Sequence, residues 1–592
     1  MDKKAIASVL REMGTLLELK GENPFKSRAY HTGARIWEQM EGEAEELITS
    51  GALRQAQGIG AALSEKIETL HRTGRLEAYD TLRASIPPGL LLMMEIESLG
   101  AKKVKLLYER LGVASIEELE AACQAGHVAA LPGFGAKSVA RILTGLRNRK
   151  AYAKRRLAWK AAPIAEAVLQ ELQAAADVEA AAVAGSLRRG LETIGDVDLV
   201  AASATPESVV EAFIGLKGIT AVTARGTTKA SVHLEDGLQV DLRVVMPEVF
   251  SAALHHFTGS KAHNVQLRRR AREQGWRLSE WGFAPLGKED EEVSMDATTS
   301  MAAELPASEA ALFERLGLSF IPPELREGMG EIEAAEAGTL PRLIEPSDIR
   351  GVFHVHTKAS DGHHTLEEMA AAAEALGWDY LGIADHSKSS VQANGLDTKR
   401  LRKQVEDIRA LNASGRFRIH VFTGTECDIL PDGSLDFEDA VLKELDYVVA
   451  SVHSAFGQDE AVMTARLIRA IEHPYTTMIG HLTGRLLLRR EPYRVDIPKV
   501  IDAAIACGKV IELNASPHRL DMDWRLWRRA IDKGLKCSIN PDAHSTAALN
   551  FYRAGVQAAR KGWVTPEAVV NTMELEAITS FLHTTRRRTL KK

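Results

Sequence analysis

The chain has 592 residues, of which 45% are hydrophobic and 26% charged, so it is long enough for several domains with ordinary buried cores. No apolar run approaches the length of a membrane span, and Met1-Asp2-Lys3-Lys4 leads into an amphipathic pattern rather than a signal peptide. With four scattered cysteines that lack metal-finger spacing, this predicts a cytoplasmic protein without a membrane partner. The net charge of −6 excludes no partner, because basic residues crowd 150–160 and 261–277 while acids crowd 289–345.

Residues 1–155 are typical of short amphipathic helices that contain a repeated glycine turn. Two copies carry Gly-x-Gly before a helix, and Ser98 stands where the first glycine of a degenerate third copy would be. A tight turn of this kind aims free backbone N–H groups at an anion, which predicts a grip on the DNA phosphate backbone without base reading. The glycines concerned are Gly58, Gly60, Gly133 and Gly135.

An apolar strand over 180–184 feeds a small-residue turn with a basic pair, and two aspartates follow. In a strand, residues i and i+2 share a face, so Asp196 and Asp198 present both carboxylates on one side. Asp241 lies on the second strand of a hairpin whose turn is Asp236-Gly237. Each acid alone would be read as solvent-facing; together the three favour a Mg²⁺ or Mn²⁺ site with oxygen ligands.

These motifs resemble those of the family X DNA polymerases, the nucleotidyltransferase-fold group that includes polymerase beta. The matching residues are Gly-Ser, Arg-Arg-Gly, Gly-Asp-x-Asp and a later Val-Asp-Leu-Arg. The resemblance implies two Mg²⁺ or Mn²⁺ ions held by the three acids, one activating the primer 3′-hydroxyl and one carrying the triphosphate. It also implies that Gly185, Ser186 and Arg189 contact the triphosphate and that Arg243 positions the acids.

The resemblance continues on both sides of this motif. Phe257 and Gly259 match a turn beneath the nucleotide sugar, Asn264 would face the incoming base, and Arg268 would enter the template minor groove. The alternative for Arg268 to Arg272 is a solvated basic face. In the N-terminal region Lys66 aligns with the Schiff-base lysine of a lyase, although cations usual in that pocket are missing, and a surface lysine is the alternative.

From residue 351 apolar strands alternate with amphipathic helices, which predicts seven βα units and a (β/α)7 barrel. Histidines and acids follow the strand ends, where functional residues of such barrels lie. The expected strands span 352–355, 380–384, 419–423, 447–450, 478–480, 510–513 and 537–539.

This half resembles the PHP (polymerase and histidinol phosphatase) domain over its full length. Nine residues match the family's metal positions, and a mixed imidazole and carboxylate set suits up to three Zn²⁺, Mn²⁺ or Fe²⁺ ions. The resemblance implies 3′→5′ exonuclease chemistry. Arg485 and Arg519 stand in loops beside expected ligands and are weaker candidates for gripping DNA phosphates. The nine are His354, His356, Asp361, His386, Glu426, His453, His481, Asp542 and His544.

The predicted organisation is a multidomain chain with an α+β nucleotidyltransferase palm between a helical N-terminal region and the barrel. We expect a monomeric DNA polymerase that fills short gaps in repair, takes deoxynucleoside triphosphates on gapped or primer-template DNA, and degrades 3′ ends. Alternatives are a DNA-binding scaffold with a small-molecule or 3′-end phosphatase, and a terminal or RNA nucleotidyltransferase. The expected boundaries are 1–80 (lyase-like), 81–155 (helix-hairpin-helix fingers), 156–255 (palm), 256–325 (thumb), 326–348 (linker) and 349–592 (PHP).

Overall fold

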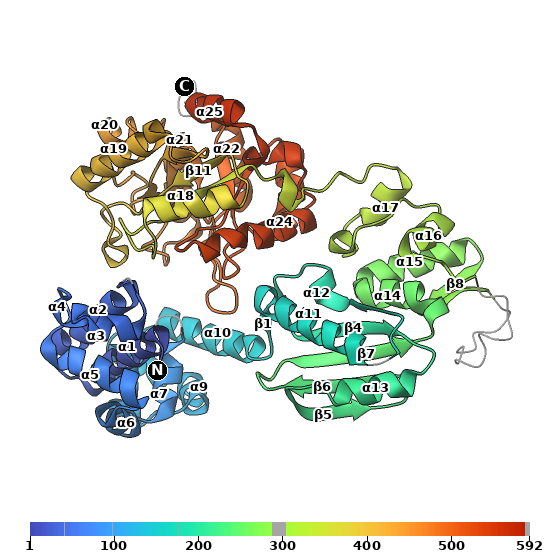
Figure 1. Cartoon of the computed structure of the whole chain (residues 1–592), viewed down its shortest axis with the longest axis horizontal. Coiled ribbons are helices and arrows are strands. Elements are labelled where there is room, and N and C mark those ends of the chain that lie inside the picture. The colour runs from blue at the N-terminus through green and yellow to red at the C-terminus, as the bar shows by residue number, and fades with distance from the viewer. Residues whose placement is uncertain (41, 97–98, 176, 287–303, 586–592) are drawn as a thin grey trace. The chain divides into compact units, whose positions relative to one another are not determined.

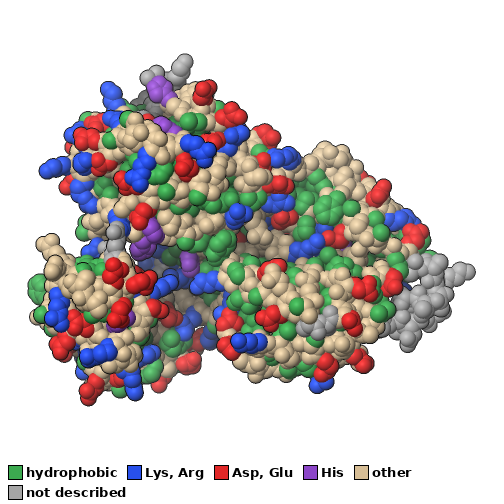
Figure 2. All heavy atoms as spheres, in the orientation of Figure 1, with side chains coloured by type: hydrophobic (Ala, Val, Ile, Leu, Met, Phe, Trp, Pro, Cys, Tyr) green, Lys and Arg blue, Asp and Glu red, His purple; other side chains and the backbone are tan. Residues whose placement is uncertain are grey.

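A computed structural model describes residues 1–40, 42–96, 99–175, 177–286 and 304–585 of the chain (Figure 1). The chain divides into two compact units, Met1–Lys154 and Arg155–Lys592. Within the described ranges no helix is long and apolar enough to cross a membrane. Lys and Arg side chains are interspersed with Asp and Glu over the face shown in Figure 2, in keeping with the small net charge.

The N-terminal unit is helical, and its buried residues form two apolar clusters, one within 6–76 and one drawn mainly from 86–146. Gly58 (φ 97°) and Gly133 (φ 81°) adopt left-handed backbone, which explains glycine in each repeated turn. Gly60, Gly100 and Gly135 are N-caps without a side-chain hydrogen bond, so the first-turn N–H groups are free of such a cap. Ser98 lies outside the described residues. The helices are α1 (Lys3–Lys20), α2 (Pro24–Gln39), α3 (Ala44–Thr49), α4 (Ala52–Gln55), α5 (Ala61–Thr73), α6 (Glu77–Ala84), α7 (Pro88–Met94), α8 (Ala101–Leu111), α9 (Ile116–Gln124) and α10 (Ala136–Tyr152).

The second unit begins with a five-stranded mixed sheet in the order β2-β4-β7-β6-β5. β4 and β7 are parallel, with Asp198 paired to Asp241, whereas β6 and β7 form the expected antiparallel hairpin. The strands are β2 (Ala180–Val183), β4 (Asp196–Ala202), β5 (Ile219–Arg225), β6 (Lys229–Leu234) and β7 (Gln239–Val245), with a separate pair β1 (Arg156–Leu157) and β3 (Thr193–Ile194).

The two faces of this sheet have different partners, because side chains alternate along each strand. Val197, Leu199 and Val240 pack in one cluster with helices α11 (Ala158–Ala175) and α13 (Pro206–Ile214). Val200 and Val245 pack on the other face with α14 (Phe250–Thr258). By the same alternation Asp196, Asp198 and Asp241 share the face of Val200 and Val245.

The thumb follows α14 and consists of α15 (Lys261–Glu273), the hairpin β8 (Trp276–Ser279) and β9 (Gly282–Pro285), and α16 (Glu309–Arg315). The expected linker is not an open connection. It contains α17 (Glu331–Glu336), and Ile332 and Leu343 are buried in the thumb cluster. Glu331 is fully buried and accepts a hydrogen bond of 2.8 Å from His263 Nδ1, because a buried acid needs a partner.

The C-terminal half forms parallel strands surrounded by helices (Figure 1). The strands pair in the orders β10-β11-β12 and β13-β14-β15-β16-β17, and a parallel bridge from Val355 to Ala543 links the two ends. The strands are β10 (Gly351–Val355), β11 (Tyr380–Ile383), β12 (His420–Thr423), β13 (Glu426–Asp428), β14 (Val449–Ser451), β15 (Met478–Ile479), β16 (Val510–Asn514) and β17 (Lys536–Asn540). The helices are α18 (Leu366–Ala375), α19 (Thr398–Ser414), α20 (Asp439–Leu442), α21 (Glu460–Glu472), α22 (Ile497–Cys507), α23 (Trp524–Asp532), α24 (Tyr552–Lys561) and α25 (Leu575–Thr585).

The third expected strand (419–423) is present as β12, and a short strand that the sequence analysis did not expect, β13, follows it. β12 pairs with β11, and β13 pairs with β14 after a break at Gly424 and Thr425. A Cβ at Gly424 would lie 2.4 Å from the Tyr447 ring, so glycine allows that ring to pack into the strand break. The break brings Glu426 to a parallel bridge with His386.

Candidate active sites

The palm acids lie on two adjacent strands of one sheet face. Asp196 and Asp198 stand on β4, and Asp241 is the direct neighbour of Asp198 on β7. Gly185 approaches this cluster closely: its φ is 59°, and a Cβ there would lie 1.8 Å from Asp198 Oδ2. Any other residue would displace the carboxylate, so the Gly-Ser turn and the acids form one site.

Without a bound cation, the three palm carboxylates would repel one another if all of them were ionised. Burial, followed by the charges of Asp196 and Asp241, raises the pKa of Asp198 to about 6. A divalent cation would relieve this repulsion, so the donor set fits Mg²⁺ or Mn²⁺. The three palm carboxylates are more widely spaced than a compact metal site requires. Among the described residues, the groups whose ligand atoms all lie within 4.8 Å of one another are four, and all four belong to the barrel. Here Asp241 accepts hydrogen bonds of 3.1 and 3.0 Å from Gln239 Nε2.

The expected nucleotide-contacting residues surround the same sheet face. Arg189 donates from Nε to Glu327 (2.9 Å) and from Nη1 to the Thr258 carbonyl (2.8 Å). Ser186 is partly exposed at the start of α12 (Gly185–Arg188). The guanidinium of Arg243 lies 5.3 Å from the centre of the Phe257 ring.

The helix that carries the next two residues, α15, begins at Lys261, and Ser260 after Gly259 is its N-cap. Asn264 donates to the His256 carbonyl at 2.8 Å, and its buried Oδ1 has no hydrogen-bond partner. Such a free acceptor fits a donor on an incoming nucleotide. Arg268 is exposed one turn later and donates to the Asn264 carbonyl at 3.2 Å.

The structure brings all nine residues expected in the barrel together at the C-terminal ends of its strands. His354, His481 and Asp542 have positive φ values of 56°, 24° and 52°. Such backbone is costly for residues other than glycine and gathers at functional sites. The four groups are His356, Asp361, His386 and His544; His354, Glu426 and His481; His354, His356 and Asp542; and His386, Glu426 and His453.

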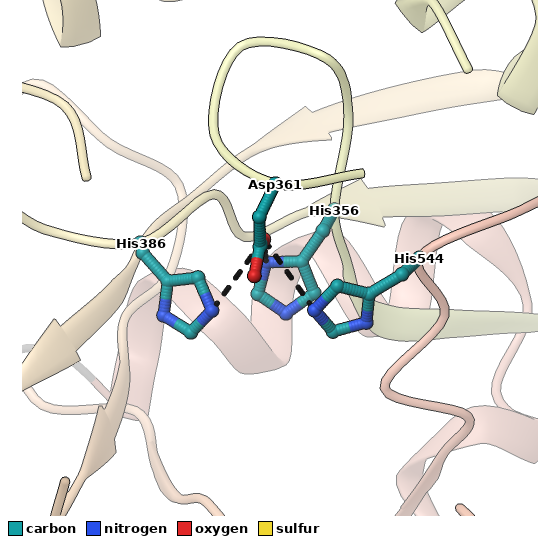
Figure 3. Close-up of side chains that lie close together, drawn as sticks. All are labelled: His356, Asp361, His386 and His544. Atoms are coloured by element: carbon teal, nitrogen blue, oxygen red, sulfur yellow. Dashed lines mark ion pairs between the residues drawn. The ribbon is translucent and has the colours of Figure 1, made fainter. Parts of the chain in front are cut away.

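Two carboxylates organise the histidine rings. Asp361 points toward the rings of His386 and His544, at 3.7 and 3.4 Å (Figure 3). Glu426 is 1% exposed, and five histidine rings lie around it: His481 and His386 at 2.8 Å, His354 and His453 at 3.2 Å, and His356 at 3.8 Å.

Several buried ring nitrogens in this centre, among them His354 Nε2 and both nitrogens of His356, make no well-directed hydrogen bond to any described residue, although carboxylates lie 3.2–3.3 Å from the Nε2 atoms. Burial, with the neighbouring His544 and His386, lowers the pKa of His356 to about 4, so its ring is neutral and able to act as a ligand. Burial also disfavours charge on His544, but the hydrogen bond to Asp361 and the charge of Asp542 outweigh it and raise that pKa to about 9. Imidazole nitrogens without a well-directed hydrogen bond, placed beside carboxylates, fit a cluster of divalent transition metals.

Three further acids hold the ligands, or the loop between His356 and Asp361, in place, and the sequence analysis gave none of them this role. Glu512 is fully buried and contacts His354 Nδ1 (2.6 Å) and the His481 N–H (2.8 Å). Asp428 accepts from His453 Nδ1, and Asp385 accepts from the Thr357 N–H at 2.8 Å. Glu512 and Asp428 stand in strands and Asp385 two residues after one, so each could have been marked as an acid in an apolar run.

Asp428 fixes the tautomer of His453, since a carboxylate can only accept and Nε2 is then left to face Glu426. We expect Asp428→Asn to weaken Mn²⁺ binding by about 10–100-fold, measured by calorimetric titration of the metal-free chain. Asp432→Asn is the matched control, because Asp432 is exposed and accepts from Ser434. Equal affinity in the two variants would contradict this role.

Other expected site residues have different surroundings. Arg485 is 6% exposed and pairs with Glu192 and with Asp523, so the expectation that it grips DNA is wrong. Arg519 lies 3.5 Å from Asp542 at the edge of the metal-ligand cluster, where it can reach a phosphate. Lys66 donates to the Ala62 carbonyl at 3.1 Å, one turn earlier on α5.

Comparison with known proteins assigns these parts. Family models match residues 1–76 (helix-hairpin-helix domain), 90–148 (SAM-like helix-hairpin-helix tandem), 253–327 (DNA polymerase beta thumb) and 353–516 (PHP domain). The chain is 38% identical over 585 residues to the DNA polymerase/3′-5′ exonuclease PolX of Bacillus subtilis, covering 98% of this chain and 99% of that one.

Relatives of the C-terminal half alone are also found. A probable phosphatase of Thermoanaerobacter is 28% identical over 37% of this chain and 89% of its own length. A probable phosphatase of Caldicellulosiruptor bescii is 29% identical over 39% and 93%. With the full-length match and the three kinds of domain, the chain belongs to the bacterial family X DNA polymerases that carry a C-terminal PHP domain.

Proposed function

We propose that this chain is a DNA polymerase that fills short gaps in repair and a 3′→5′ exonuclease acting on the same primer end. The observation that carries the proposal is the direct pairing of Asp198 with Asp241 beside Gly185, in a chain that matches a polymerase/exonuclease along its whole length. The substrates are deoxynucleoside triphosphates and gapped or primer-template DNA.

In the palm, Asp196, Asp198 and Asp241 would hold two Mg²⁺ or Mn²⁺ ions, which lower the pKa of the primer hydroxyl and neutralise the triphosphate. Gly185 lets the backbone approach the acids, and Ser186 and Arg189 orient the triphosphate. Phe257 and Gly259 form the turn beneath the sugar, Asn264 offers its free acceptor, and Arg268 faces the template. Arg243 places positive charge beside Asp198.

In the barrel, the nine ligand residues would hold up to three Zn²⁺, Mn²⁺ or Fe²⁺ ions, which activate water and polarise a phosphodiester. Glu512 and Asp428 orient the imidazoles, and Arg519 would neutralise a phosphate oxygen. The uncapped helix N-termini at Gly60, Gly100 and Gly135 support DNA backbone binding by the N-terminal unit, with Gly58 and Gly133 shaping the turns. Lys66 as a lyase residue remains a proposal that rests on the family alignment.

The raised pKa of Asp198 sets a pH dependence for the palm. Because the pKa of Asp198 in the folded chain, about 6, exceeds the ordinary value of 3.8, its stability contribution in the metal-free chain is fully present below about pH 4 and is lost as pH rises through about 6. Metal binding requires the ionised form, so we expect the Mg²⁺ concentration for half-maximal extension to rise steeply as pH falls below about 6. Extension rates over a Mg²⁺ series from pH 5.5 to 8 measure this, and a flat requirement would contradict it.

A second candidate for the barrel is removal of phosphate from a 3′ end, which the probable phosphatase relatives favour. The metal cluster could act on the phosphodiester of a DNA strand or on a 3′-phosphate monoester. One experiment separates these functions: a 5′-labelled primer in a gapped duplex, with Mg²⁺ or Mn²⁺, with and without deoxynucleotides. Extension supports the polymerase, and a ladder of shorter products supports the exonuclease. A parallel assay uses the same primer with a 3′-phosphate, and loss of that phosphate without shortening supports the phosphatase. Failure to extend in any metal would overturn the polymerase proposal.

A further inference from the structure

A lysine of the PHP domain reaches the expected triphosphate-binding arginine of the palm. Lys561 is the last residue of α24, and its side chain is fully buried. Its Nζ donates to the carbonyl oxygen of Arg189 at 3.1 Å and to that of Glu324 at 3.3 Å. It also lies 2.5 Å from Glu327 Oε1.

The same Glu327 oxygen accepts from Arg189 Nε at 2.9 Å. One carboxylate oxygen is therefore shared by Arg189 and Lys561, and the lysine also holds the Arg189 backbone. Arg189 Nη1 is fixed on the Thr258 carbonyl, so neither Nε nor Nη1 can turn freely. The Arg189 side chain stays 13% exposed and the Glu327 side chain 15% exposed, so the cluster borders solvent.

The packing around this cluster makes Lys561 part of the polymerase half. Trp563, two residues beyond it, is buried in the thumb cluster with Leu325 and Phe313. Arg560 pairs with Glu324 at 2.7 Å. The Trp524 ring centre lies 4.4 Å from Lys561 Nζ, so the ammonium group also makes a cation–π contact.

The net charge of this cluster suits a triphosphate ligand. Glu327 alone would neutralise Arg189 and repel a triphosphate, whereas Lys561 balances Glu327 and leaves the cluster with one net positive charge. A charge-assisted network of this kind also fixes the direction of the guanidinium.

We propose that Lys561 is a positioning residue for the polymerase reaction: a side chain of the PHP domain that orients Arg189 of the nucleotide site and keeps the net charge of the Arg189–Glu327–Lys561 cluster positive. This rests on the proposed role of Arg189 in triphosphate binding. The PHP domain then completes the polymerase site in addition to carrying its own metal cluster.

The test is single-nucleotide incorporation by the full-length chain on a gapped duplex, with KM and kcat measured separately. Lys561→Met should raise KM for the deoxynucleotide about tenfold while kcat changes less than about twofold, because a ground-state contact to the triphosphate is weakened. Lys561→Arg should restore most of the affinity. The 3′→5′ degradation rate of each preparation should match wild type, which shows that the barrel is folded.

Two further variants separate positioning from mere domain docking. Arg560→Met removes the neighbouring pair with Glu324 without touching Arg189 or Glu327, and it should keep the wild-type KM. The double variant Glu327→Gln with Lys561→Met should raise KM no more than the worse single variant, because both act through Arg189. An equal rise in Arg560→Met, or additive effects in the double variant, would overturn the inference.

The result also distinguishes this inference from the proposed function. If wild type extends the primer and Lys561→Met keeps its KM, the positioning role is wrong and the polymerase stands. If wild type does not extend, both are wrong.

Discussion

Asp198→Ala should lower primer extension by at least about a thousandfold while leaving 3′→5′ degradation at the wild-type rate. Asp198 pairs directly with Asp241, and burial together with the neighbouring carboxylates raises its pKa, so its removal takes away a central ligand. The assay is a 5′-labelled primer in a gapped duplex with Mg²⁺, followed by gel analysis with and without deoxynucleotides.

The control for this variant is Asp236→Ala. Asp236 caps the turn of the same hairpin by accepting from the Leu238 N–H, and it lies outside the metal-binding trio. It should reduce stability slightly and keep extension within a few-fold of wild type. Extension by Asp198→Ala near the wild-type rate would place the polymerase site elsewhere.

His354→Ala should have the opposite effect, with degradation reduced by about a hundredfold or more and extension kept. His354 belongs to two of the four ligand groups, with Glu426 and His481 and with His356 and Asp542. Its loss also leaves Glu512 buried without its 2.6 Å partner, so affinity for metal should fall along with activity. The measurements are the rate of primer shortening and the Mn²⁺ content of the purified variant.

His583→Ala is the matched control, because this histidine is exposed on α25 and is not among the metal-binding groups of the described chain. It should keep both activities and the full metal content. Persistent degradation by His354→Ala after repeated purification would mean that another site, or another protein, cuts the DNA. Together the two variants test whether synthesis and degradation use separate centres.

Much of both sites could be predicted locally, because short-range geometry places the residues. Period-two alternation puts Asp196 and Asp198 on one face, and the Asp236-Gly237 turn places Asp241 on the returning strand. In the barrel, each metal-binding candidate follows an apolar strand, and parallel strands bring such ends to one edge.

The supporting residues could not be found in this way. Glu512, Asp428 and Lys561 act through partners far along the chain, and hydrogen-bond partners are set by packing rather than by sequence spacing. Arg485 shows the same limit: a basic residue beside ligands suggested DNA contact, but its side chain is buried against Glu192 and Asp523.

The sequence by itself therefore predicted the helix-hairpin-helix, palm, thumb and PHP domains, through motifs that resemble those of known families, and the family models for three of these domains match. It also supplied the three palm acids and the nine barrel residues as candidates, because strand periodicity and motif chemistry mark them. Only the tertiary structure decided that β4 and β7 run parallel with Asp198 opposite Asp241, and that β12 and β13 break at Gly424. It alone also joined Lys561 to Arg189, because long-range pairing depends on which apolar faces bury one another and which buried charges then need a partner.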